Sequence, residues 1–207
     1  MTRPAAVVFD IGNVLIEWQP ERYYDRVIGA PRRRALFAEV DLHAMNERID
    51  RGADFRAVVE ETAARWPDHA DAIRLWHDDW AEMAAPEIPL SVRLMRRLRL
   101  RGVPVFILSN IGTATWEIAC RRYAFLTEAD RAYVSGRMAV TKPDPAIYAQ
   151  VEADCGLPPA ALLFADDRAD NIATAAARGW RTHLFDGPEG WARRLVAEGL
   201  LTEEDAG

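Results

Sequence analysis

Four short apolar runs, each ending at a polar residue, constrain the fold of this chain more than any other feature of its sequence. They cover residues 5–9, 103–108, 161–165 and 181–185, and they are followed by Asp10, Ser109, Asp166 and Asp186. Apolar runs of this length are typical of strands that are buried on both faces of a parallel sheet. A weaker run at residues 132–134 predicts a fifth strand.

Helical patterns alternate with these runs. They cover residues 91–100, 115–123, 145–155 and 171–178, and Gly102, Gly156 and Gly179 follow three of them. Glycine directly after a periodic apolar segment is a common helix stop. The alternation of strands and helices predicts an α/β fold with a doubly wound parallel sheet, a Rossmann-like core.

Residues 17–88 interrupt this alternation, because no strand is indicated there and the gap is far longer than a normal crossover connection. The segment has a helical period, with Ile73, Trp76, Trp80 and Met83 on one stripe. Such stripes usually pack in a core, so we assign Trp76 and Trp80 to packing. We therefore predict a core of residues 1–16 and 89–207, with an inserted helical module at 17–88.

The composition excludes several classes of partner. A formal net charge of −6 provides no general attraction for nucleic acid or an anionic membrane. The two cysteines, Cys120 and Cys155, have no zinc-type spacing and indicate no disulfide framework. No apolar run approaches the roughly 20 residues that a membrane-spanning helix needs, and no signal peptide is indicated. We expect a cytoplasmic protein, as a monomer or a homodimer.

Polar residues stand where the predicted strands end. Asp10, the pair Ser109 and Asn110, and the pair Asp166 and Asp167 each follow a strand, and Lys142 lies in a loop ahead of a helix. Ligands of parallel α/β sheets bind outside the carboxyl ends of the strands. The sequence therefore predicts that these side chains share one site.

At these residues the sequence resembles the haloacid dehalogenase-like hydrolases over nearly its whole length. Four segments carry the resemblance: Asp10-Ile-Gly-Asn-Val-Leu15, Leu108-Ser109-Asn110, Lys142-Pro-Asp-Pro145, and Phe164-Ala-Asp-Asp167 with Asn171 beyond it. The insertion resembles the helical cap of that family's subfamily I, and the motifs are similar to a branch that includes glucose-1-phosphate phosphatase-like proteins.

The resemblance implies roles for these residues. Asp10 is the expected nucleophile, Ser109 holds the substrate oxygens together with nearby backbone amides, and Lys142 neutralises nucleophile and phosphate. Mg²⁺ would be bound by Asp10, the Gly12 carbonyl and Asp167. This arrangement makes physical sense, because a metal and a lysine offset the repulsion between a carboxylate and a phosphate.

Other roles are open at this stage. Asp166 is either a further metal ligand or an acceptor that positions other groups, and Asn171 either caps a helix or orients the metal ligands. On the substrate side we expect Asn110 and Gly12, together with Trp18 and Arg22 from the start of the insertion.

The first motif departs from the usual phosphatase pattern at Gly12, where the resemblance implies a second aspartate that serves as general acid. General acid catalysis is worth roughly 10²- to 10⁴-fold in rate, so its loss matters. A leaving group of low pKa, such as the anomeric oxygen of a sugar 1-phosphate, would need little protonation. The sequence thus predicts an Mg²⁺-dependent phosphomonoester hydrolase that acts on a small phosphorylated metabolite, with sugar phosphates as one hypothesis.

Two alternatives remain from the sequence. A 2-haloacid dehalogenase would use the same aspartate without a metal, and the Asp166-Asp167 pair argues against it. A binding or regulatory protein that retains the fold but has lost efficient chemistry is the second alternative, because the general acid is missing.

Overall fold

A computed structural model describes residues 3–207, so the first two residues of the predicted core lie outside the described part. Its main sheet has five strands in the order β5-β4-β1-β6-β7, and every neighbouring pair is parallel. The strands are β1 (Ala6–Phe9), β4 (Val105–Ser109), β5 (Arg131–Val134), β6 (Leu162–Asp166) and β7 (Arg181–Leu184). The predicted doubly wound α/β fold is confirmed.

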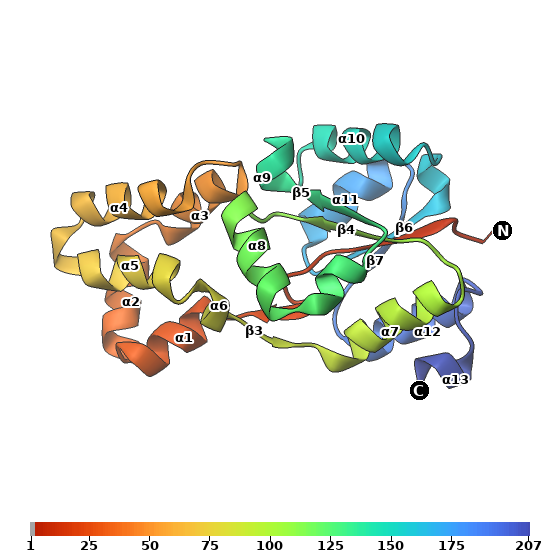
Figure 1. Cartoon of the computed structure of the whole chain (residues 1–207), viewed down its shortest axis with the longest axis horizontal. Helices are drawn as coiled ribbons and strands as arrows, with labels where there is room; N and C mark the ends of the chain where they lie inside the picture. Colours follow the sequence, from red (N-terminus) through yellow and green to blue (C-terminus); the bar gives the residue numbers. More distant parts are fainter. Residues whose placement is uncertain (1–2) are drawn as a thin grey trace.

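Both faces of the three central strands, β1, β4 and β6, are buried, which explains their uninterrupted apolar runs, whereas the edge strand β7 is only partly buried. Along β1, Val7 and Phe9 belong to one hydrophobic cluster, whereas Ala6 and Val8 belong to another. The first cluster includes residues of α7 (Pro89–Leu100) and α12 (Pro188–Ala197), and the second includes residues of α10 (Pro145–Cys155) and α11 (Ala169–Ala177). Figure 1 shows these two pairs of helices on opposite sides of the sheet.

The helix ends follow the glycine signals closely. Gly102, Gly156 and Gly179 all have positive φ angles, of 69°, 69° and 92°, a conformation that glycine adopts without a steric penalty.

The remaining elements of the core are α8 (Thr113–Arg122), η2 (Ala124–Glu128), α9 (Ser135–Met138), η3 (Pro159–Ala161) and α13 (Glu203–Ala206). No helix in residues 3–207 has both the length and the apolar character needed to cross a membrane.

Six helices of the described chain lie between β1 and α7 and form a separate group at one end of the sheet (Figure 1). They are α1 (Pro20–Val27), α2 (Ala30–Glu39), α3 (Leu42–Asp50), α4 (Phe55–Arg65), α5 (Ala70–Asp78) and α6 (Trp80–Met83), with a short 3-10 turn, η1 (Pro67–His69). We call this group the helical insertion. Its limits as an independent domain, residues 17–88, stay a prediction.

The expectation that residues 17–88 contain no strand is wrong at both ends. Strands β2 (Ile16–Trp18) and β3 (Ala84–Glu87) pair antiparallel and form a two-stranded ribbon. They are only three and four residues long, too short to show the alternation by which strands are detected in sequence. The ribbon joins the helical insertion to the core.

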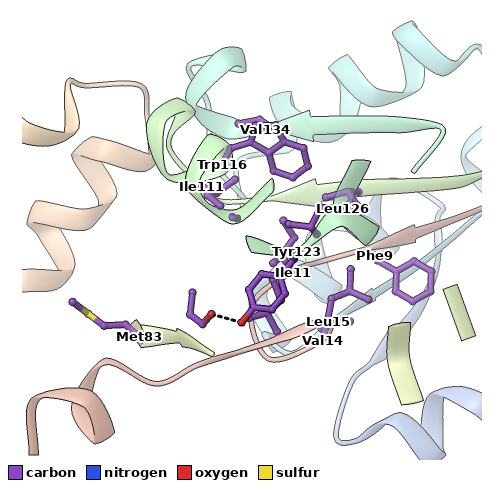
Figure 2. Packing of buried hydrophobic residues seen from close by; sticks show 14 of the residues in the cluster. Phe9, Ile11, Val14, Leu15, Met83, Ile111, Trp116, Tyr123, Leu126 and Val134 are labelled. Carbon is purple, nitrogen blue, oxygen red and sulfur yellow. Dashed lines mark hydrogen bonds between the residues drawn. The ribbon is translucent and has the colours of Figure 1, made fainter. Parts of the chain in front are cut away.

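One hydrophobic cluster runs from the sheet into the insertion. It contains Phe9 and Trp191 of the core together with Ile73 and Trp76 of the insertion. Figure 2 shows part of this cluster, with the Tyr123 hydroxyl donating a hydrogen bond to the Ala84 carbonyl at 3.0 Å. Trp76 and Trp80 are both buried, which confirms their assignment to packing.

Candidate active site

A cleft of about 630 Å³ lies between the carboxyl ends of the strands and the helical insertion. Predicted site residues that line it are Asp10, Gly12, Trp18, Ser109, Asn110, Lys142, Asp167 and Asn171. Asp166 lies directly beneath its floor, bonded to Lys142. The cleft thus brings together residues from four separate segments of the sequence.

Asp10 follows β1 at the centre of the sheet. Its backbone amide donates to the Ala165 carbonyl at 3.0 Å, which fixes it against β6, and the residue is 7% exposed. Burial raises the pKa of Asp10 to about 6; the charge of Lys142 opposes this shift, and the carboxylates of Asp166 and Asp167 add to it. The site therefore favours a cation next to this carboxyl.

Lys142 supplies one such cation. Its Nζ lies 2.9 Å from Asp10 Oδ1 and 2.6 Å from Asp166 Oδ2, and it donates to the Leu108 carbonyl at 2.9 Å. The residue is 3% exposed. Burial lowers its pKa, but Asp10 and Asp166 outweigh that effect and leave the pKa raised. Lys142 is thus a charged ammonium group between two carboxylates.

Asp166 is fully buried and uses both of its oxygens within the protein. Oδ1 accepts from the Arg168 backbone amide at 2.8 Å and from Asn171 Nδ2 at 2.9 Å; Oδ2 accepts from Asn171 at 3.0 Å and from Lys142. This pattern favours the positioning alternative for Asp166. Asn171 is the third residue of α11, whose N-cap position is Arg168, and its side chain donates to both Asp166 oxygens, so it orients Asp166 instead of capping the helix.

Three carboxylates are gathered where a divalent cation would bind. Asp10, Asp166 and Asp167 each offer an oxygen within 4.8 Å of the other two. Burial raises the pKa of Asp167, against the effect of a hydrogen bond from Asn13. Carboxylate oxygens are the hard donors that Mg²⁺ prefers. The single positive charge of Lys142 does not balance the negative charge of three carboxylates. The residues present therefore fit a metal, with Asp10 and Asp167 having the freer oxygens.

Asn13 is a site residue that the sequence reasoning missed. Its Nδ2 donates to Asp167 Oδ2 at 3.0 Å, and its Oδ1 accepts from the Trp18 backbone amide at 3.0 Å. The backbone of Asn13 is left-handed, with φ 54°, a conformation in which asparagine is enriched. An asparagine after Gly12 was the available signal. Asn13 joins the first motif to the acidic pair.

Ser109 and Asn110 end β4 at the floor of the cleft. Ser109 is buried and lines the cleft with Asp10. The Asn110 side chain accepts from the Lys142 amide at 2.7 Å and donates to the Lys142 carbonyl at 2.8 Å. Asn110 thus holds the lysine loop in place, a role that the sequence did not indicate. Its contact with substrate stays a prediction.

The insertion provides the opposite wall of the cleft. The Trp18 ring packs 5.8 Å from that of Trp76 and 5.7 Å from that of Trp80, and all three line the cleft. Helix α3 adds Asn46 and Asp50, neither of which belongs to a recognisable motif. Sequence reasoning missed them because only the folded insertion brings them to the site.

Arg22 is not among the residues that line the cleft. Its guanidinium donates to Glu17 at 2.8 Å and to the Ala85 carbonyl at 2.6 Å, so it ties α1 to the ribbon. Its predicted contact with substrate finds no support, because local partners at the ribbon occupy the side chain.

Comparisons with known proteins agree with this geometry. A family model described as haloacid dehalogenase-like hydrolase matches residues 4–179. A HAD family enzyme from Bacteroides thetaiotaomicron is 25% identical, with a TM-score of 0.71 over 94% of this chain and 99% of that chain. The same enzyme in complex with magnesium and inorganic phosphate is 25% identical, with a TM-score of 0.68 over 92% and 98%.

Two further proteins show how widely the resemblance extends. Drimenol cyclase drtB of Aspergillus calidoustus is 31% identical over 92% of this chain, which spans only 36% of that protein. An L-2-haloacid dehalogenase of Xanthobacter autotrophicus shares the fold, with 22% identity and a TM-score of 0.62 over 97% of this chain and 85% of that chain. With the family model covering most of its length, the chain belongs to the haloacid dehalogenase-like hydrolases and is a hydrolase.

Proposed function

We propose that this hydrolase cleaves phosphate monoesters of small metabolites through a covalent acyl phosphate on Asp10, with Mg²⁺ as cofactor. The observation that carries the proposal is the charge arrangement: Lys142 lies 2.9 Å from Asp10 and 2.6 Å from Asp166, beside a second acidic ligand, Asp167. Such a site favours an anionic substrate only when a further cation is bound.

The protein's own groups have distinct tasks in this reaction. Asp10 attacks phosphorus in line with the leaving group, and the resulting aspartyl phosphate is later hydrolysed by water. Lys142 offsets the charge of Asp10 and of the entering phosphate. Ser109 is positioned to donate to a phosphate oxygen, while Asn110 and Asp166 hold Lys142 in place. None of these groups has to reorganise during the reaction, which favours the transition state.

Asp10, Asp167 and the Gly12 carbonyl are the proposed Mg²⁺ ligands. When bound, the metal would neutralise charge on the phosphate oxygens and orient them. The Bacteroides relative, whose structure holds magnesium and inorganic phosphate, supports Mg²⁺ as the cofactor. We further propose that the helical insertion is a cap of the subfamily I kind, because its tryptophans and α3 form one wall of the cleft.

A metal-free dehalogenase is the weaker reading. The Xanthobacter dehalogenase shares the fold at 22% identity, a level that does not transfer an activity. A metal-independent enzyme has no need of carboxylate oxygens gathered within 4.8 Å, because their mutual repulsion only destabilises the site.

The test is a phosphate-release screen against phosphorylated metabolites, sugar 1-phosphates included, with Mg²⁺ and with EDTA. We expect turnover that requires Mg²⁺ and that falls by roughly 10³-fold or more in Asp10→Asn, since the nucleophile is lost. Equal rates for both proteins would point to a contaminant and to a binding role for the fold. Chloride release from 2-chloropropionate that survives EDTA would instead favour the dehalogenase.

A further inference from the structure

The first motif offers no proton donor for the leaving group, because Gly12 stands where the resemblance implies an acid. The cleft does contain an unassigned carboxyl group. Asp50, the last residue of α3, lines it from the insertion side. None of the roles proposed above uses this side chain, although it faces the same cavity as Asp10, Ser109 and Lys142.

The Asp50 carboxyl is held by a short chain of hydrogen bonds. Asn46 Nδ2 donates to Asp50 Oδ2 at 2.8 Å, and Trp76 Nε1 donates to Asn46 Oδ1 at 3.1 Å. Trp76 is one of the largest fully buried side chains of the described residues. The chain therefore ties Asp50 to the packed interior of the insertion, while the residue still lines the cleft.

The end of α3 is also docked on the core at very short range. A Cβ atom at Gly112 would lie 2.7 Å from Ile49 Cγ2, and one at Gly52 would lie 2.6 Å from the Gly136 carbonyl oxygen. Ser135 Oγ donates to the Asp50 carbonyl at 2.6 Å. Only glycine permits these approaches, so the position of Asp50 relative to the ends of β4 and β5 is closely defined.

The surroundings of Asp50 favour its protonated form. Burial raises its pKa well above the ordinary value, a hydrogen bond from the Gly112 backbone acts in the opposite direction, and the charges of Asp10 and Glu47 raise it again. Lys142 lowers it by a smaller amount.

We propose that Asp50 is the general acid and base of this hydrolase, supplied by the insertion in place of the group missing at Gly12; the inference rests on the proposed phosphatase function. As Asp10 attacks and the bond from phosphorus to the leaving oxygen breaks, Asp50 gives its proton to that oxygen. The Asp50 carboxylate then takes a proton from the water that attacks the aspartyl phosphate. Alcohol and inorganic phosphate leave, and both aspartates return to their starting states.

The experiment compares two esters of similar shape, 4-nitrophenyl phosphate and phenyl phosphate. The phenolate of the second is far more basic and needs a proton as it leaves. Asp50→Asn is expected to lower kcat/KM for phenyl phosphate by roughly 10²-fold, as loss of a general acid does, and to affect 4-nitrophenyl phosphate much less. Asp71→Asn, the same change at an exposed site of the insertion, is the control and is expected to change neither rate.

A rescue variant separates chemistry from folding. A Cβ at Gly12 meets only Trp18 Cβ, at 3.8 Å, which is ordinary contact, so the backbone there accepts a residue with a side chain. Adding Gly12→Asp to Asp50→Asn is expected to restore the ratio of the two rates, because the acid returns on the core side. A merely structural role for Asp50 would not be rescued in this way.

Three outcomes overturn the inference. The first is an unchanged ratio of the two rates in Asp50→Asn, whether activity is kept or lost equally on both esters. The second is failure of Gly12→Asp to restore that ratio. In either case the proposed function still stands if the wild type is active and the Asp10→Asn variant is not. The third is a wild type that, with Mg²⁺, hydrolyses neither of these esters nor any compound of the metabolite screen, and it rejects the proposed function together with this inference.

Discussion

The two walls of the cleft are built in different ways. On the core wall, Asp10, Lys142 and Asp166 are almost fully buried and bonded to one another. On the insertion wall, the α3 side chains of His43 and Glu47 are exposed and do not bond to the core wall. The core wall therefore fixes reacting groups, whereas the rim of the insertion wall presents exposed side chains that can contact different substrates.

The difference does not extend to the base of the insertion wall. Behind its exposed rim, Trp76 is buried in the hydrophobic cluster that also contains Phe9 of β1. Because the inner part of this wall is packed and only its rim is exposed, the wall can hold its side chains at a constant distance from Asp10. This view of the two walls leads to three predictions.

The largest effect is expected at the base of the insertion wall. Trp76 is 1% exposed, and Trp76→Ala is expected to lower the free energy of unfolding by about 4 kcal/mol, as large-to-small core changes do. Trp66→Ala is the control, because Trp66 is 40% exposed. Urea unfolding followed by circular dichroism measures both. One transition is expected because the cluster is continuous; two separate transitions would mean that the walls unfold independently.

A smaller effect is expected at the core wall. Lys142→Met removes the cation between Asp10 and Asp166 and is expected to cost about 3 kcal/mol of stability without metal, because buried carboxylates lose their partner. The exposed pair of Arg51 and Glu47 on the insertion side provides the control, and Arg51→Met is expected to cost less than about 0.5 kcal/mol. Equal losses in chemical denaturation would contradict the contrast between the walls.

The smallest effect tests the link between the walls. Asn13 bridges Asp167 and the Trp18 backbone, and Asn13→Gly keeps the left-handed backbone while removing both hydrogen bonds. Loss of a residue that orients a metal ligand typically costs about 10-fold in metal affinity, so half-saturation by Mg²⁺ in the phosphate-release assay is expected to rise by about that factor. An unchanged Mg²⁺ requirement would show that Asp167 is oriented without Asn13, provided that the melting temperature is preserved.

Sequence reasoning succeeded on the core wall because most of its residues stand at the ends of strands, whereas Lys142, in a loop ahead of a helix, was identified through its motif. Once five parallel strands were inferred, their polar ends had to meet, and Asp10 and Asp167 did so. The three central strands were detectable because both of their faces are buried. The packing of Trp76 and Trp80 was also predicted, from the helical stripe on which they lie.

The remaining features depend on contacts that no local pattern encodes. Asn110 resembles a substrate residue in sequence, but its side chain pairs with the Lys142 backbone across 32 positions. Arg22 lies close to the first motif in sequence and yet binds the ribbon, a ribbon whose strands were too short to predict. Asp50 reaches the cleft only because α3 docks on the core through glycines.

That docking has an evolutionary consequence. At Gly52, Gly112 and Gly136 the insertion meets the core main chain to main chain, and none of these three glycines lines the cleft. Replacement of the residues around the cavity can therefore change substrate preference while the catalytic geometry stays the same. A single added methyl group at Gly112, in contrast, would push the insertion away from the core.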